Sequence, residues 1–114
     1  MGNDEALEPE QARQLVASNE ATVLDIRDDD AWHEKRIPGA QHASQDDLDA
    51  TLEDVDDDRT VMIVCEDGER SAEVAAELRE DGREAKSIEG GMRAWEKEKF
   101  PLQPSTDPDD DVDM

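Results

Sequence analysis

The chain has 114 residues, enough for one domain, and its 34 acidic and 12 basic residues give a net charge of -22. A surface this acidic repels phosphates, which excludes nucleic acid and anionic membrane surfaces as natural partners. No apolar run approaches the roughly 20 residues of a spanning helix, and the first residues lack the apolar core of a secretory signal. The single cysteine cannot form an internal disulfide. We therefore expect a cytoplasmic monomer.

The hydrophobic content is low for a folded domain. Val, Ile, Leu and Phe account for 19 of the 114 residues, a level that is typical of disordered chains when the net charge is high. These residues are nevertheless concentrated in short runs, TVLDI and TVMIV, and at helical spacing between the runs, which indicates a fold. Four lysines among so many acids fit a protein whose self-repulsion is screened by molar salt. We therefore expect a salt-adapted protein, with an ordinary acidic protein as the alternative.

The first half of the chain predicts alternating helices and strands. A proline after an acidic residue suits the first turn of a helix, and the β-branched run that follows is typical of a strand. The Pro-Gly pair further on cannot be helical and predicts a turn. In chain order we expect a helix at Glu8–Ser18, a strand at Ala21–Ile26, helical turns at Asp28–Lys35, a turn at Ile37–Ala40, an extended piece at Gln41–Ala43, and a helix capped by Ser44 that carries Leu48, Leu52 and Val55.

The second half contains the strongest strand signal. Thr60–Val64 is a continuous apolar run, as in strands buried on both faces of a parallel sheet. After it we expect a polar loop at Cys65–Arg70, a helix at Ser71–Asp81, a strand at Ala85–Ile88, a turn at Gly90-Gly91, a helix at Met92–Lys99 and, from Gln103, a disordered acidic tail. This alternation predicts an α/β fold, with a parallel sheet flanked by helices on both faces. The domain would comprise residues 1–102 and the tail residues 103–114.

Cys65 stands where an α/β sheet binds its ligands, directly after the strongest strand and before a loop that leads into a helix. Backbone N–H groups around the sulfur, the helix N-terminus and Arg70 would favour a thiolate and bind an anion. Gly68 permits the tight bend that such a loop needs. The alternative is a small buried hydrophobe, but the loop context favours a reactive nucleophile.

Cys65, Gly68, Arg70 and Ser71 form the pattern Cys-x-x-Gly-x-Arg-Ser, which resembles the active-site loop of the single-domain rhodaneses. Three further blocks agree with that family in order and spacing: Leu24-Asp25-Ile26-Arg27, Ile37-Pro38-Gly39-Ala40 and Gly90-Gly91-Met92-Arg93-Ala94-Trp95. The resemblance extends from about Leu7 to Leu102. It implies a rhodanese-like domain whose cysteine accepts a sulfane sulfur, becomes a persulfide and passes the sulfur to a thiophilic acceptor.

The resemblance also implies a role for each motif residue. Cys65 would be the catalytic nucleophile. The substrate would be bound by the loop residues, whose amides surround the outer sulfur while Arg70 binds the donor anion or orders the loop: Glu66, Asp67, Gly68, Glu69, Arg70 and Ser71. Structural support of the site would come from Asp25 and Arg27, which brace the fold, and from the close-packed turn at Gly90 and Gly91. Trp95 would belong to the core.

No cofactor is implied. The donor would be thiosulfate or a persulfide, and the acceptor a thiol, cyanide or a sulfur-carrier protein. The sequence departs from the family pattern at Lys35-Arg36, which replaces a Gly-His pair, and we expect His33 and His42 to be structural or exposed. Glu66, Asp67 and Glu69 make the loop acidic, which disfavours a doubly charged donor such as thiosulfate.

Three other kinds of site are weighed against a sulfurtransferase. Phosphatases and arsenate reductases of the same fold use a loop one residue longer, whereas here Arg70 is at position +5 from Cys65 and Ser71 at +6. A non-catalytic interaction module usually lacks the cysteine, and this loop is intact. A metal site would need more than one cysteine and two dispersed histidines.

Overall fold

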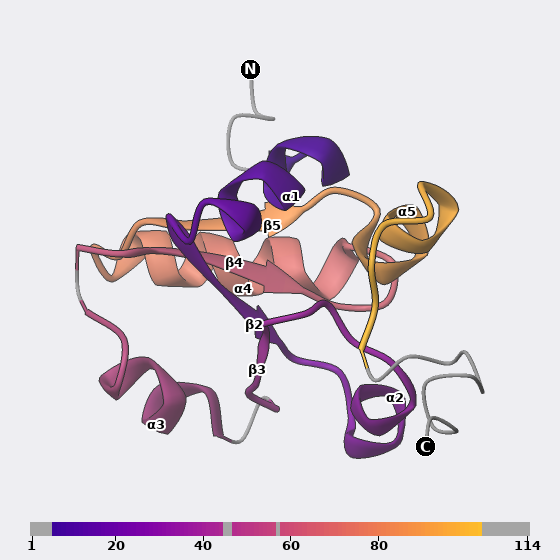
Figure 1. Cartoon of the computed structure of the whole chain (residues 1–114). Coiled ribbons are helices and arrows are strands. Elements are labelled where there is room, and N and C mark those ends of the chain that lie inside the picture. The colour runs from indigo at the N-terminus through magenta and orange to yellow at the C-terminus, as the bar shows by residue number, and fades with distance from the viewer. Residues whose placement is uncertain (1–5, 45–46, 57, 104–114) are drawn as a thin grey trace.

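The computed structural model of the protein describes residues 6–44, 47–56 and 58–103 (Figure 1). Five parallel strands form one sheet in the order β1-β5-β4-β2-β3. The strands are β1 (Ala6–Leu7), β2 (Ala21–Asp25), β3 (Gln41–His42), β4 (Thr60–Val64) and β5 (Ala85–Ile88). The helices are α1 (Pro9–Ala17), α2 (Asp29–Glu34), α3 (Leu48–Glu53), α4 (Glu69–Glu80) and α5 (Gly91–Lys97). The expected α/β class with a parallel sheet is therefore confirmed.

Helices cover both faces of the sheet. The central strand β4 sends Val61 and Ile63 to a core formed with α3 and α4, and Met62 and Val64 to a second core formed with α1 and α5. All four of these side chains are fully buried, as the continuous apolar run predicts. In Figure 1, α1 and α5 lie on one side of the sheet and α4 on the other.

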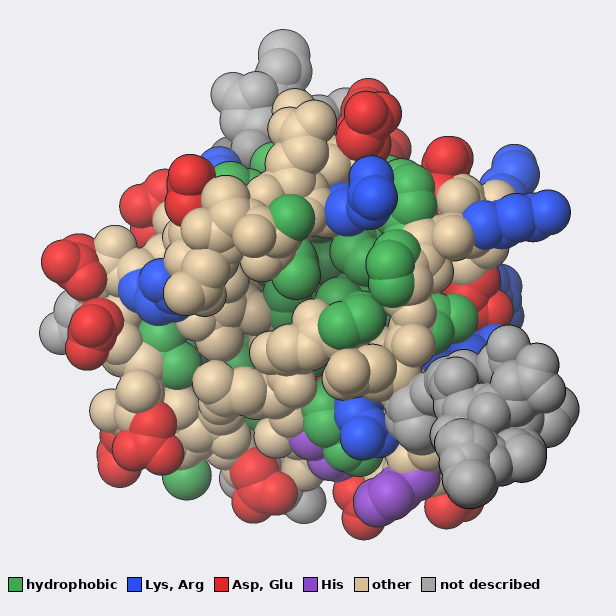
Figure 2. Space-filling model, in the orientation of Figure 1, with side chains coloured by type: hydrophobic (Ala, Val, Ile, Leu, Met, Phe, Trp, Pro, Cys, Tyr) green, Lys and Arg blue, Asp and Glu red, His purple; other side chains and the backbone are tan. Residues whose placement is uncertain are grey.

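The acidic composition is carried by the surface. Figure 2 shows acidic side chains around the edge of one face and hydrophobic side chains gathered at its centre. Among the acidic residues that the structure describes, Asp25 alone is buried. Within the described residues, no helix is long and apolar enough to span a membrane.

Three details differ from the expectations or add to them. Strand β1 was not expected; it has two residues and pairs with Ser87 and Ile88 at the edge of the sheet. Helix α4 begins at Glu69, two residues earlier than expected, because Gly68 adopts a φ of 91° that ends the loop abruptly. Gln103, the first residue of the expected tail, exchanges backbone hydrogen bonds with Arg36; residues 104–114 lie outside the described part of the chain.

Candidate active site

The register of the sheet brings three chain segments to one point. Asp25, the last residue of β2, is the direct partner of Val64, the last residue of β4, and also of His42 on β3. The carboxyl ends of parallel strands share one edge of a sheet, so the residues after these strands meet there. Arg27, Ser44 and Cys65 accordingly lie around the same space.

Cys65 is held by the amides of its own loop. Its Sγ accepts hydrogen bonds from the backbone N–H groups of Gly68, at 3.2 Å, and Ser71, at 3.3 Å, and the Oγ of Ser71 lies 3.4 Å away. The residue is 5% exposed. Amide donors that converge on one sulfur beside a helix N-terminus stabilise negative charge there. The arrangement suits a sulfur nucleophile that lines a pocket.

The start of helix α5 holds this loop in place through backbone hydrogen bonds. The N–H groups of Met92 and Arg93 donate to the carbonyls of Cys65, at 2.8 Å, and Glu66, at 3.0 Å. Gly91 has a φ of 61°, and a Cβ placed on it would stand 2.4 Å from the carbonyl oxygen of Cys65. The loop and the start of α5 therefore contact each other backbone to backbone, which explains the Gly90-Gly91 pair.

Replacing Gly91 with alanine should displace the loop. The added Cβ would meet backbone atoms, which cannot move aside as the end of a flexible side chain can, so the amides around Sγ would lose their alignment. We expect Cys65 to react with iodoacetamide about tenfold more slowly, and the free energy of unfolding to fall by about 1–3 kcal/mol. Gly82→Ala is the matched control, because Gly82 also has a positive φ, 94°, but open space around its Cβ position. Equal effects of the two substitutions on cysteine reactivity would contradict the prediction.

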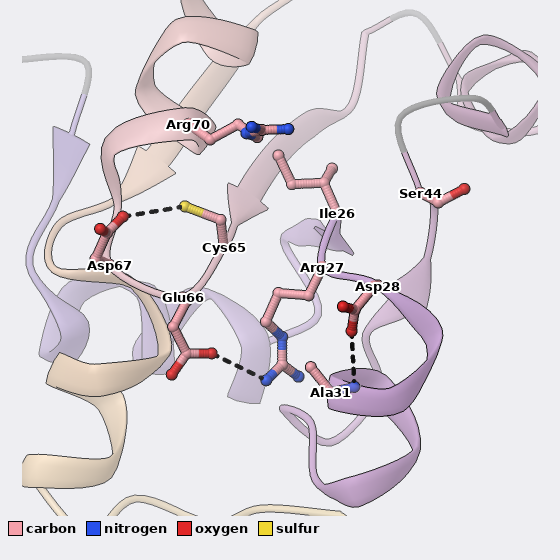
Figure 3. Close-up of a pocket in the computed structure, with 9 residues that line it drawn as sticks. All are labelled: Ile26, Arg27, Asp28, Ala31, Ser44, Cys65, Glu66, Asp67 and Arg70. Atoms are coloured by element: carbon pink, nitrogen blue, oxygen red, sulfur yellow. Dashed lines mark hydrogen bonds and ion pairs between the residues drawn. The ribbon is translucent and has the colours of Figure 1, made fainter.

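A pocket of about 550 Å³ opens in front of Cys65 (Figure 3). Its lining consists of Ile26, Arg27, Asp28, Ala31, Ser44, Cys65, Glu66, Asp67 and Arg70. Five of these residues belong to the expected site: Cys65, Glu66, Asp67 and Arg70 from the loop, and Arg27 as structural support. Gly68 and Ser71 serve through their amides, while the side chain of Glu69 is exposed and does not line the pocket.

The three acidic residues of the loop occupy different positions. Glu66, with half of its side chain exposed, pairs with Arg27 at 3.7 Å and with Arg93 at 3.9 Å. Asp67 places Oδ1 3.9 Å from the sulfur of Cys65 and accepts a hydrogen bond of 3.0 Å from the amide of Glu69. The backbone N–H of Glu69 therefore donates to the Asp67 side chain.

Arg27 both braces the fold and lines the pocket. Its guanidinium binds Asp25 through Nε, at 3.0 and 3.1 Å, and through Nη2, at 2.8 Å, and Nη2 also donates to the carbonyl of Lys35 at 2.6 Å. Burial lowers the pKa of Arg27, but the hydrogen bonds and charge of Asp25, together with Glu66, outweigh it and raise that pKa above its ordinary value. Arg27 therefore stays charged in the lining of the pocket.

The two histidines lie outside the pocket lining. The Nε2 of His42 is 2.7 Å from the carbonyl oxygen of Arg27, and the His42 ring stacks on Trp32 at 4.9 Å. The guanidinium of Arg36 also lies over the Trp32 ring, 4.6 Å from the ring centroid. His33 is exposed, and its Nδ1 lies 2.9 Å from the carbonyl oxygen of Asp29.

Sequence reasoning missed the far wall of the pocket. Asp28 and Ala31 come from the start of α2, where the carboxylate of Asp28 accepts the N–H of Ala31 at 3.0 Å. Ser44 follows β3 and was expected only to cap a helix. These residues carry no motif, and only the strand register brings them to the site. Across residues 6–44, 47–56 and 58–103 no three His, Cys, Asp or Glu side chains gather as metal ligands.

Two curated relatives are similar to this protein in sequence over about three quarters of the chain. The Bacillus subtilis (strain 168) protein YtwF, named as a sulfurtransferase, is 36% identical over 87 residues, which cover 76% of this chain and 84% of YtwF. Thiosulfate sulfurtransferase GlpE of Coxiella burnetii is 34% identical over 86 residues, which cover 75% of this chain and 80% of GlpE.

Solved structures share the fold. A rhodanese-related protein from Thermoplasma volcanium has a TM-score of 0.79 at 21% identity and covers 89% of this chain and 99% of its own. A rhodanese-like domain protein from Staphylococcus aureus has a TM-score of 0.72 at 27% identity, over 80% of this chain and 90% of its own. Residues 8–98 match the rhodanese-like domain. The strand order, the cysteine loop and these likenesses agree, and the chain belongs to the rhodanese-like domain family.

Proposed function

We propose that the protein is a sulfurtransferase that carries a sulfane sulfur as a persulfide on Cys65. The observation that supports this most is the pair of amides, from Gly68 and Ser71, that donate to Sγ of a cysteine lining the pocket. Relatives named as sulfurtransferases add to this support, and one of them is named as a thiosulfate sulfurtransferase.

The chemistry needs only the thiolate and the loop. The thiolate attacks the sulfane sulfur of the donor, a new S–S bond forms, and the donor's bond to that sulfur breaks with its electron pair on the leaving group. With thiosulfate, the leaving group is sulfite. Attack by cyanide on the outer sulfur then releases thiocyanate and restores the thiolate. The loop amides stabilise the charge on sulfur before and after each step.

The length of the loop favours sulfur over a phosphate ester. Helix α4 begins four residues after Cys65, and the amide of Ser71, at position +6, already donates to Sγ at 3.3 Å. A loop closed this tightly around the sulfur suits one added sulfur atom better than a tetrahedral oxyanion.

Mass spectrometry of the full chain tests the proposal. Incubation with thiosulfate, or with a small-molecule persulfide, should add one sulfur atom to Cys65, and cyanide should remove it with release of an equal amount of thiocyanate. If neither donor produces an adduct on Cys65, the proposal is wrong, and the domain is a non-catalytic interaction module.

A further inference from the structure

Asp67 differs from the other acidic residues of the loop in what it contacts. Its Oδ1 lies 3.9 Å from the sulfur of Cys65. In the described part of the chain, its other hydrogen bond comes from the amide of Glu69, a neutral group. Glu66, in contrast, is paired with two arginines. Of the three loop carboxylates, Asp67 is therefore the one that places its negative charge beside the reacting sulfur.

The arginines of the pocket are placed differently. Arg27 is already bound to Asp25 and to Glu66. Arg70 extends on the side of Ile26, whereas Asp67 lies on the other side of Cys65 (Figure 3). A ligand that reaches Sγ thus has a carboxylate on one side and a guanidinium on the other.

We propose that Asp67 determines the charge preference of this site, which deepens the proposed sulfurtransferase function and rests on it. Its carboxylate disfavours sulfur donors that carry negative charge next to the transferred sulfur, as thiosulfate does. It favours donors whose group at that position is neutral or positive, such as the persulfide of an aminothiol. Unit charges a few ångströms apart at a protein surface change a rate or an affinity by about tenfold.

Thiol-reactive probes of opposite charge test this without relying on sulfur transfer. The probes are the 2-(trimethylammonio)ethyl and 2-sulfonatoethyl esters of methanethiosulfonic acid. In both, the thiolate attacks the sulfur that bears the ethyl group, a mixed disulfide forms, and methanesulfinate leaves with the electron pair of the broken S–S bond. Cys65 is the only cysteine of the chain, so mass spectrometry of the intact protein follows its modification alone.

The quantity measured is the rate with the cationic probe divided by the rate with the anionic probe. Both probes react with the same thiolate, so the ratio does not depend on how much of the thiol is ionised. In 10 mM salt, Asp67→Asn should lower the ratio by about tenfold, and the difference should shrink in 1 M KCl, where the screening length is about 3 Å. The asparagine keeps an oxygen that can accept the hydrogen bond from the backbone N–H of Glu69.

Glu73→Gln is the matched control, because Glu73 is exposed on α4 and its substitution also removes one negative charge. Its ratio should equal that of the wild type. If Asp67→Asn does not fold, Asp67→Ser replaces it, since a serine hydroxyl can also accept the amide. An unchanged ratio in the Asp67 variant, an equal fall in both variants, or a Cys65 that reacts with neither probe would each overturn the proposal. The sulfur adduct with a persulfide donor would still report separately on the proposed function.

Discussion

Cys65→Ser should abolish sulfur transfer to cyanide and leave the fold unchanged. Serine differs little from cysteine in volume. Its hydroxyl oxygen can accept the two hydrogen bonds that the backbone N–H groups of Gly68 and Ser71 now donate to the sulfur. A hydroxyl cannot form the persulfide, however, so we expect the rate of thiocyanate formation to fall on the order of a thousandfold or more.

The structural half of this prediction is checked separately. Far-ultraviolet circular dichroism and the denaturant midpoint of Cys65→Ser should match those of the wild type, because the residue is a small member of the core around α4. Substantial transferase activity in the serine variant would show that another group carries the sulfur. A large loss of stability would instead show that Cys65 is required for packing.

The main elements of the fold could be predicted from local patterns. The run at Thr60–Val64 contains no polar residue after its first position, which is typical of a strand buried on both faces of a parallel sheet. Helices α1 and α4 have ends marked by a proline and by glycines. Strand β1 could not be predicted, because two residues have no periodicity and their pairing with β5 is a tertiary contact.

The shape of the cysteine loop could be predicted because the loop is continuous in sequence. The loop from Cys65 to Ser71 forms one turn into a helix, so the spacing of its residues indicates its shape. Asp28 and Ser44 line the pocket opposite this loop, and they reach it only because of the register between neighbouring strands, which the sequence does not show. Which acid lies beside the sulfur depends on side-chain pairing, because Glu66 pairs with Arg27 and Arg93, whereas Asp67 Oδ1 lies 3.9 Å from Sγ of Cys65.

For Arg27, the sequence predicts one role of the side chain but not the other. An Asp-x-Arg block after a strand predicts an internal brace, and the ion pair with Asp25 agrees with that. The pattern gives no sign that the same guanidinium lines the pocket and contacts Glu66 from the cysteine loop. That contact exists because β2 and β4 are neighbours in the sheet and end at the same residue pair.

The second large effect should follow from removing the charge of Asp25, which is fully buried. Asp25→Asn keeps the shape of the side chain but leaves the buried guanidinium of Arg27 without its closest anion. Breaking a buried ion pair on one side costs about 3–5 kcal/mol, a large part of the 5–15 kcal/mol by which domains are typically stable. We therefore expect a much lower denaturant midpoint, and a loss of activity that accompanies unfolding.

Two companion variants identify the ion pair as the cause. Asp28→Asn removes a nearby exposed carboxylate while keeping a residue that can accept the N–H of Ala31, so its free energy of unfolding should change by less than about 0.5 kcal/mol. The double variant Asp25→Leu with Arg27→Met replaces both charges with apolar groups and should recover much of the lost stability. Since the pKa of Arg27 is raised, the contribution of the pair should persist through neutral and mildly alkaline pH, and be lost only as the pH rises through that raised value. A double variant as unstable as Asp25→Asn would contradict this account, because the hydrogen bonds of Arg27 to the backbone, rather than its charge pairing, would then be what holds this end of the sheet.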